Sequence, residues 1–460
     1  MTVPTNIFGD IPIHPWEWTA LFFYLVFIFI IAGIVQRRKI DRHPEYKYFN
    51  LGLLAKVGGG IGFALIYLFY YEGGDTFSYY ETTLAFSNML GEDPGTFLET
   101  FFGEASAENK SKFTTSTGVP YGYIYLNENA LFTSKILLPF VLLGLRSYIL
   151  TTVLISVATF FGLWRLYRMF VSYFPHLKKK LAITVLFLPS VVFWGSGILK
   201  DSFTIAAVCY FITSTDHIIN KKTEVILNWI TFIISAFFIL SIKPYIFMIA
   251  IPGTMVWLSY KRLQRIRNRL FRYLIVPILY VVILAGSYTV LTTLGDALGR
   301  YSLDKAFQMA AVIQEDLQQE YYHGHTFDIG DFEPTPTGVL SKFPIATVSG
   351  LYRPFLPEVA NLVMLLSALE TSILLVLTIL PLFRNRISDL FGFLTSNPLL
   401  IYCILFSILF AFMIGVTTPN YGALVRFRIP FLPLFASTLM ILSDRKAVRD
   451  PAFRGRELKQ

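Results

Sequence analysis

Charged residues and cysteines are both scarce in this sequence. Only 15% of its 460 residues are charged and 54% are hydrophobic, whereas globular domains are about 25% charged. The two cysteines, Cys209 and Cys403, fall in apolar runs, which argues against a disulfide framework and a cysteine metal cluster. The sequence also lacks G-x-S-x-G, P-loop and H-E-x-x-H motifs, which argues against the soluble enzyme classes that carry them.

The sequence is rich in long apolar runs. Almost uncharged stretches occur at 18–35, 52–71, 148–163, 225–242 and 401–416. They approach the ~20 residues that an α-helix needs to cross ~30 Å of hydrocarbon. The first run follows a stretch without Lys or Arg and has no A-x-A-like end, so we expect a retained helix rather than a cleaved signal peptide. The sequence predicts one all-α, polytopic integral membrane domain over residues 1–460, surrounded by membrane lipids.

Basic residues gather in short tufts between the apolar runs and predict the orientation. The formal net charge of +9 is therefore assigned to topology rather than to nucleic-acid binding. The tufts fall on the cytoplasmic side if about eleven helices cross, with the N-terminus outside and the C-terminus inside. The predicted spans are 17–36, 52–71, 147–164, 181–198, 203–219, 225–242, 244–260, 273–293, 358–382, 398–416 and 429–443. The apolar run 136–145 is short, so we expect it to be interfacial or re-entrant; if it crosses, the orientation downstream changes.

Two predicted outward loops, 72–134 and 295–357, are too long to be simple connections. Loops longer than about 12–15 residues are often lids or binding loops. Within the second loop, apolar residues recur near helical spacing from Leu298 to Leu317, which predicts a helix along the membrane surface.

Charged residues recur at the outward ends of the predicted spans. These residues are Glu72, Asp75, Lys200, Asp201, Lys243, Arg353, Glu358, Arg426 and Arg428. Glu370 lies halfway along the span 358–382, where a charge costs ~2.5–3.5 kcal/mol on insertion scales. The pattern predicts a shared cavity that opens away from the cytoplasm.

Each of these charges also has a structural interpretation. Lys200 and Lys243 could snorkel to the headgroups, and Asp201 could cap a helix. Arg426 and Arg428 could be interfacial anchors, and Glu370 could be the structural partner of a basic residue.

The stretch YYEGGDTFSYYETTLAF, residues 70–86, indicates carbohydrate chemistry. Gly73 and Gly74 let the backbone turn, and Asp75 follows, close to the aromatic rings of Tyr79 and Tyr80. Such rings stack on the apolar faces of sugars, and a carboxylate can take a proton from an attacking hydroxyl. The alternative is an aspartate that only stabilises the turn.

These residues resemble a known family. The run from Asp75 through Tyr79 to Ala85, just outside an early helix, resembles the first outward loop of GT-C-type membrane glycosyltransferases. The segment RFRIPFLPLFA, 426–436, is similar to the Arg- and Pro-rich ends of that superfamily and of O-antigen-polymerase-like proteins. FLPSVVFWGSGILKDS, 187–202, and LYRPFLPEVANLVMLLSALE, 351–370, resemble segments of bacterial polysaccharide-assembly membrane proteins.

The resemblance implies sugar transfer from a polyprenyl-phosphate-linked donor to a glycan or glycolipid, on the outer side of the bacterial inner membrane. Asp75 would be the general base, while Lys200, Arg353, Arg426 and Arg428 would hold the donor phosphate. Asp201 would cap its helix and orient Lys200, and Tyr79, Lys243 and Glu370 complete the candidate site. One departure stands out: Thr76 follows Asp75 where the family often has a second acid, and the nearest acids are Glu72 and Glu81.

Other possibilities remain open at this stage. His323, His325, Asp328 and Asp331 are metal-ligand types, and a divalent ion is conceivable, but H-x-H in a polar loop is not specific and no metal is assigned. A repeat-unit polymerase would use the same donor chemistry. A transporter or flippase would use Glu370, Lys200 and Asp201 as a path, although the sequence shows no paired halves of the transporter kind.

Overall fold

The computed structural model describes residue 11 and residues 13–264, 326–360 and 362–450. It also describes single positions in the intervening stretch, at 275, 278, 282, 286, 308, 312, 315, 316 and 319. Apart from such positions, the predicted span 273–293 and the predicted surface helix of the second loop lie outside the described residues.

The described elements are helical, with one isolated β-bridge between Thr326 and Asn420. Seven helices are long and apolar enough to cross a membrane. They are Pro15–Lys39 (α1), Pro44–Tyr71 (η1, α2 and η2), Tyr148–Tyr173 (α8), Lys200–Lys221 (α11 and η4), Val225–Ile242 (α12), Met364–Arg384 (in α19) and Pro398–Thr417 (α21). The all-α prediction is confirmed for the described residues, and the helices are consistent with a multi-pass membrane protein.

Three predicted spans differ in the structure. The segment 181–198 is divided into α9 (Lys178–Leu186) and α10 (Pro189–Trp194), because Pro189 lacks an N–H and the residue before a proline avoids the helical conformation. The apolar part of α13, Pro244–Tyr260, is shorter than the spanning helices. The segment 429–443 contains α23 (Leu432–Leu442), which is bent by 72° from α22 (Tyr421–Phe427). If the bent pair of α22 and α23 counts as one span, eight spans are described. Eleven spans with a fixed orientation remain a prediction.

The chain folds into two compact units. Unit 1 comprises Met1–Val171, Val185–Ser214 and Trp229–Pro244, and unit 2 comprises Ser172–Thr184, Thr215–Asn228 and Tyr245–Gln460. Each unit is therefore assembled from separate stretches of the chain.

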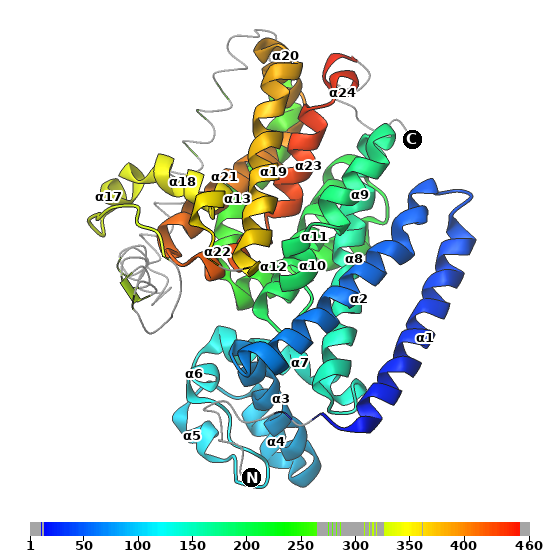
Figure 1. The fold of residues 1–460 in the computed structure, drawn as a ribbon, viewed down its shortest axis with the longest axis vertical. Helices are drawn as coiled ribbons and strands as arrows, with labels where there is room; N and C mark the ends of the chain where they lie inside the picture. The colour runs from blue at the N-terminus through cyan, green and yellow to red at the C-terminus, as the bar shows by residue number, and fades with distance from the viewer. Residues whose placement is uncertain are drawn as a thin grey trace. The chain divides into compact units, whose positions relative to one another are not determined.

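In unit 1, the segment 72–134 is folded into helices (Figure 1). They are α3 (Asp75–Glu92), α4 (Pro94–Phe102), α5 (Ala107–Ser111), α6 (Gly122–Tyr125) and the first part of α7 (Glu128–Leu143). α3 and α7 pack together around a buried cluster that includes Phe86, Phe97, Phe113 and Tyr125. The short run 136–145 mostly belongs to α7, which contains Pro139 and ends before Gly144. The first predicted loop is thus a small helical subdomain.

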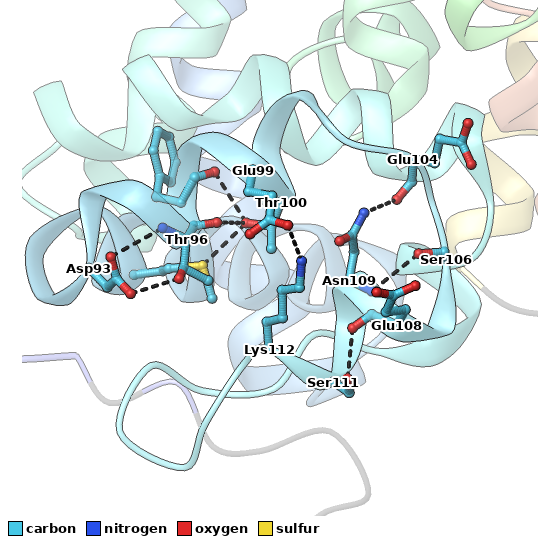
Figure 2. Close-up of polar contacts among 12 residues, drawn as sticks. Asp93, Thr96, Glu99, Thr100, Glu104, Ser106, Glu108, Asn109, Ser111 and Lys112 are labelled. Carbon is cyan, nitrogen blue, oxygen red and sulfur yellow. Dashed lines mark hydrogen bonds and ion pairs between the residues drawn. The ribbon is translucent and has the colours of Figure 1, made fainter.

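Polar side chains fix the ends of the short helices in this subdomain. Asp93 accepts the backbone N–H groups of Gly95 and Thr96, at 3.0 and 3.1 Å, and so caps α4; its contact with Thr96 is drawn in Figure 2. Ser106 accepts the N–H of Asn109 at 3.2 Å and caps α5. These caps satisfy N–H groups that have no partner within their own helix.

Unit 2 contains α13 (Pro244–Gln264) and the helices that follow it. They are α17 (Pro336–Ser341), α18 (Phe343–Tyr352), α19 (Leu362–Arg384), α20 (Ile387–Thr395), α21, α22, α23 and α24 (Arg445–Arg449). α18 and α21 pack closely through glycines. A Cβ on Gly350 would overlap the backbone of Ala411, and one on Gly415 would overlap that of Ala346. Glycine allows this close approach because it has no side chain.

Candidate functional site

A sharp turn places Asp75 at the start of α3. The apolar helix α2 (Phe49–Ile66) ends in the π-helical turn η2 (Tyr67–Tyr71), and Glu72, Gly73 and Gly74 then adopt positive φ angles of 48°, 150° and 106°. Asp75 is the first residue of α3 and is exposed. Its carboxylate therefore combines access to solvent with the favourable field of a helix N-terminus.

One turn further along α3, Tyr79 meets Lys200. Tyr79 is buried, and the Lys200 ammonium lies 5.9 Å from the centre of its ring. An ammonium at this distance from an aromatic ring is within the range of a cation–π interaction. Lys200 is the first residue of α11 (Lys200–Asp216) and is half-buried. The structure thus brings together Tyr79 and Lys200, two predicted site residues that are far apart in the sequence.

Asp201 and Lys243 form an ion pair inside unit 1. The carboxylate of Asp201 is fully buried, and the Lys243 ammonium donates a hydrogen bond to it. Lys243 follows α12 directly and is itself buried. Removing either partner would leave an unpaired buried charge, which is strongly destabilising. Both residues were predicted to lie in the site, but their pairing was not.

The turn between α10 and α11 is held by hydrogen bonds from side chains. Lys56 Nζ donates to the Gly195 carbonyl and, at 3.4 Å, to the Val191 carbonyl. Lys56 lies inside α2 and is only 2% exposed. Lys56 was not among the predicted site residues, although a lysine within the predicted span 52–71 was the signal that could have found it.

Unit 2 contains a second group of charged residues. The Arg353 guanidinium pairs with Glu358 at 3.4 Å and lies 4.8 Å from the ring centre of Phe327. Arg428, 1% exposed, donates to the backbone carbonyl of Arg353. Among the described residues, the Nη1 atom of Arg428 has no hydrogen-bond partner.

Two more predicted site residues belong to this second group. Glu370, 6% exposed on α19, is the opposite charge that acts on Arg428. Arg426 is half-buried, with its guanidinium 5.7 Å from the ring centre of Phe427. Unit 2 therefore contains a buried carboxylate whose charge is opposite to that of the buried Arg428 guanidinium.

The predicted site residues thus fall into two groups, which we name by their units. The unit 1 group is Asp75, Tyr79, Lys200, Asp201 and Lys243, and the unit 2 group is Arg353, Glu358, Glu370, Arg426 and Arg428. Each group combines basic side chains with carboxylates, and cations of both groups lie near aromatic rings.

The four residues of metal-ligand type in the second loop are only partly described by the structure. His323 and His325 lie outside the described residues. Asp328 is exposed and accepts the N–H of Gly330 at 2.6 Å, and Asp331 is exposed. Within the described part of the chain, no three His, Cys, Asp or Glu side chains are placed to hold a metal ion.

Comparison with protein-family models, with curated proteins and with solved structures gives no match for this chain. The resemblance to GT-C-type enzymes therefore remains a prediction from the short segments of the sequence analysis.

Proposed function

We propose that this protein is a multi-pass membrane glycosyltransferase of the bacterial inner membrane. It would take a sugar from a polyprenyl-phosphate-linked donor on the outer side of the membrane and pass it to a glycan or glycolipid acceptor during cell-surface polysaccharide assembly. The observation that supports this most is the unit 1 group. An exposed carboxylate, Asp75, begins α3, and about one turn further along the half-buried Lys200 ammonium lies 5.9 Å from the ring centre of Tyr79.

In the proposed reaction, Asp75 accepts the proton of the acceptor hydroxyl as general base. The hydroxyl oxygen forms a bond to the anomeric carbon of the donor sugar while the bond from that carbon to the phosphate oxygen breaks. The departing lipid phosphate keeps the electron pair, and the Lys200 ammonium stabilises its charge. Tyr79 holds Lys200 through its ring, and Asp201 with Lys243 fixes the start of α11.

Surface glycans of the source organism test this proposal. The gene is deleted and complemented with wild type, Asp75→Asn or Glu108→Gln, and the glycans are separated on a gel. Glu108 is a matched control because it is another exposed acid in the first turn of a helix of the same subdomain. We expect the deletion to lose a glycan, and wild type and Glu108→Gln to restore it, while Asp75→Asn does not. Unchanged glycans in the deletion strain would overturn the proposal. Loss of a whole ladder, rather than one band, would favour the repeat-unit polymerase.

Transport of a lipid-linked sugar is the second candidate, and one observation favours it. The 72° bend between α22 and α23 leaves Arg428 at a break between two apolar helices, with Glu370 acting on it. Discontinuous helices of this kind line substrate sites in many transporters. If transport is the function, Glu370→Gln should abolish complementation and Asp75→Asn should retain it, which is the opposite of the expectation for a transferase.

A further inference from the structure

The turn between α10 and α11 lies at the depth of the membrane-spanning helix α2. Lys56, near the middle of the apolar helix Pro44–Tyr71, contacts Gly195. Further along α2, the ring of Phe63 lies directly against Gly197, where a Cβ would overlap it. At 1.5 Å per residue, Phe63 is about 12 Å before the end of that helix at Tyr71. Residues 195–199 therefore form an irregular turn inside the span rather than at its end.

Backbone at this depth needs internal hydrogen-bond partners, because lipid offers none. The Gly195 carbonyl accepts from Lys56, the Ser196 carbonyl from Ser156 Oγ at 2.9 Å, and the Gly197 carbonyl from Ser202 Oγ at 2.7 Å. Three successive carbonyls are thus held by side chains from α2, α8 and α11.

The turn that Lys56 holds leads directly to the unit 1 group. Lys200 follows the turn directly, and Asp201 follows Lys200. The described hydrogen bonds of Lys56 both go to backbone carbonyls at the end of α10. Gly59 packs against the backbone of Val192, so α2 has no room to move towards α10.

We propose that Lys56 is a positioning residue: its ammonium fixes the 195–199 turn within the membrane and so sets where Lys200 meets the phosphate of the lipid-linked donor. This inference rests on the proposed function. In this arrangement Lys200 reaches the donor phosphate from a turn within the membrane, which suits a donor whose polyprenyl chain stays in the lipid. The alternative is that Lys56 only stabilises the fold as a C-terminal cap of α10.

The test compares Lys56→Met and Lys56→Arg with Lys135→Met in the full-length protein in lipid nanodiscs. Lys135 is a matched control in unit 1, because it donates to the carbonyl of Gly103, the C-cap residue of α4, at 3.2 Å. Backbone hydrogen exchange is measured for the peptides that cover 189–202 and 94–106. Transfer from a polyprenyl-phosphate-linked sugar donor is measured as kcat and as KM for the donor.

We expect Lys56→Met to speed exchange in 195–199 at least tenfold and to lower kcat at least tenfold, with donor KM changed less. Lys56→Arg, which keeps N–H donors at this position, should restore both to within a few-fold of wild type. Lys135→Met should speed exchange only near Gly103 and leave kcat unchanged. If Lys56→Met does not fold, Ser156→Ala, which removes the hydrogen bond to the Ser196 carbonyl, is measured in the same way.

Unchanged exchange in 195–199 for Lys56→Met would overturn the inference, even if the wild-type protein is an active transferase. An equal fall in kcat for Lys135→Met would also overturn it, because a general loss of stability would then explain the result. A third outcome is that exchange changes as expected but the wild-type protein transfers no sugar. Lys56 would then hold the turn, but the proposed function would be wrong, and so would the role of Lys56 towards the donor.

Discussion

Asp75 and Asp201 each stand in the first turn of a helix that follows a glycine-containing turn, yet their surroundings are opposite. Asp75 is exposed at the start of α3. Asp201 is fully buried at the start of α11 and is paired with Lys243. An exposed carboxylate can exchange partners with a substrate, whereas a buried pair cannot separate without a large cost. This difference is consistent with the chemical role that we propose for Asp75 and with a structural role for Asp201.

The two turns also use glycine for different reasons. Gly74 has a φ of 106°, a conformation that other residues adopt only with strain. Gly197 instead lies against the ring of Phe63, which leaves no room for a Cβ. The turn before α3 therefore depends on backbone freedom, and the turn before α11 depends on close packing inside the membrane-spanning helices.

The largest effect is expected from breaking the buried pair. Lys243→Met leaves the Asp201 carboxylate buried without its cation, so the free energy of unfolding should fall by about 3–5 kcal/mol. Thermal unfolding in detergent measures the change. The double variant Asp201→Asn/Lys243→Met is the control, and it should lose much less because no buried charge remains. A double variant as unstable as Lys243→Met would show that the pair is not what stabilises the start of α11.

Gly197→Ala should have the next largest effect. The added Cβ would overlap the ring of Phe63, and overpacking of this kind costs about 1–3 kcal/mol. Gly58→Ala is the matched control on α2, because a Cβ there meets nothing within 4 Å. It should stabilise the helix by about 0.5–1 kcal/mol. Equal unfolding temperatures for the two variants would contradict the close packing of the 195–199 turn.

Asp75→Asn should change stability far less than Lys243→Met. Asp75 is exposed in the first turn of α3, and loss of a favourable charge at such a position costs about 0.3–1 kcal/mol. The same unfolding measurement checks this value. A loss comparable to that of Lys243→Met would show that Asp75 is a structural residue, and the failure of Asp75→Asn to restore a glycan would then carry no information about a general base.

Much of the helical architecture could be predicted, because the length and hydropathy of an apolar run are local properties. The runs 17–36, 225–242 and 398–416 correspond to α1, α12 and α21. The break at Pro189 was missed because it lies inside an apolar run, where the period of hydrophobic residues continues across it. The helices of 72–134 were missed because their core residues are distributed over several short segments.

The candidate site was predicted as a list of residues but not as a set of contacts. Asp201 and Lys243 were both on the list because charges at the ends of apolar runs are visible in the sequence. Their pairing depends on how α11 and α12 pack, which no single segment encodes. Lys56 is visible in the sequence as a lysine within an apolar run, but its role could not be predicted, because its partners are backbone carbonyls, which leave no signature in the sequence.

The smallest expected effect concerns Glu81, which lies on α3 between Asp75 and the buried subdomain core. Partial burial raises the pKa of Glu81, and a hydrogen bond with Tyr121 offsets only part of that rise. The native state then holds this proton more tightly than the unfolded chain, so stability falls as the pH rises from the unfolded pKa through the higher folded pKa.

Glu81→Gln should therefore raise the unfolding temperature slightly at pH 8 and leave it unchanged near pH 4, where both states are protonated. Glu108→Gln is the control for removing one negative charge from the subdomain, since Glu108 is exposed. A gain for Glu81→Gln that is equal at both pH values would mean that packing, rather than the buried charge, explains it. A gain only at pH 8 would show that α3 carries a carboxylate at a cost, which Asp75, exposed at the start of the same helix, avoids.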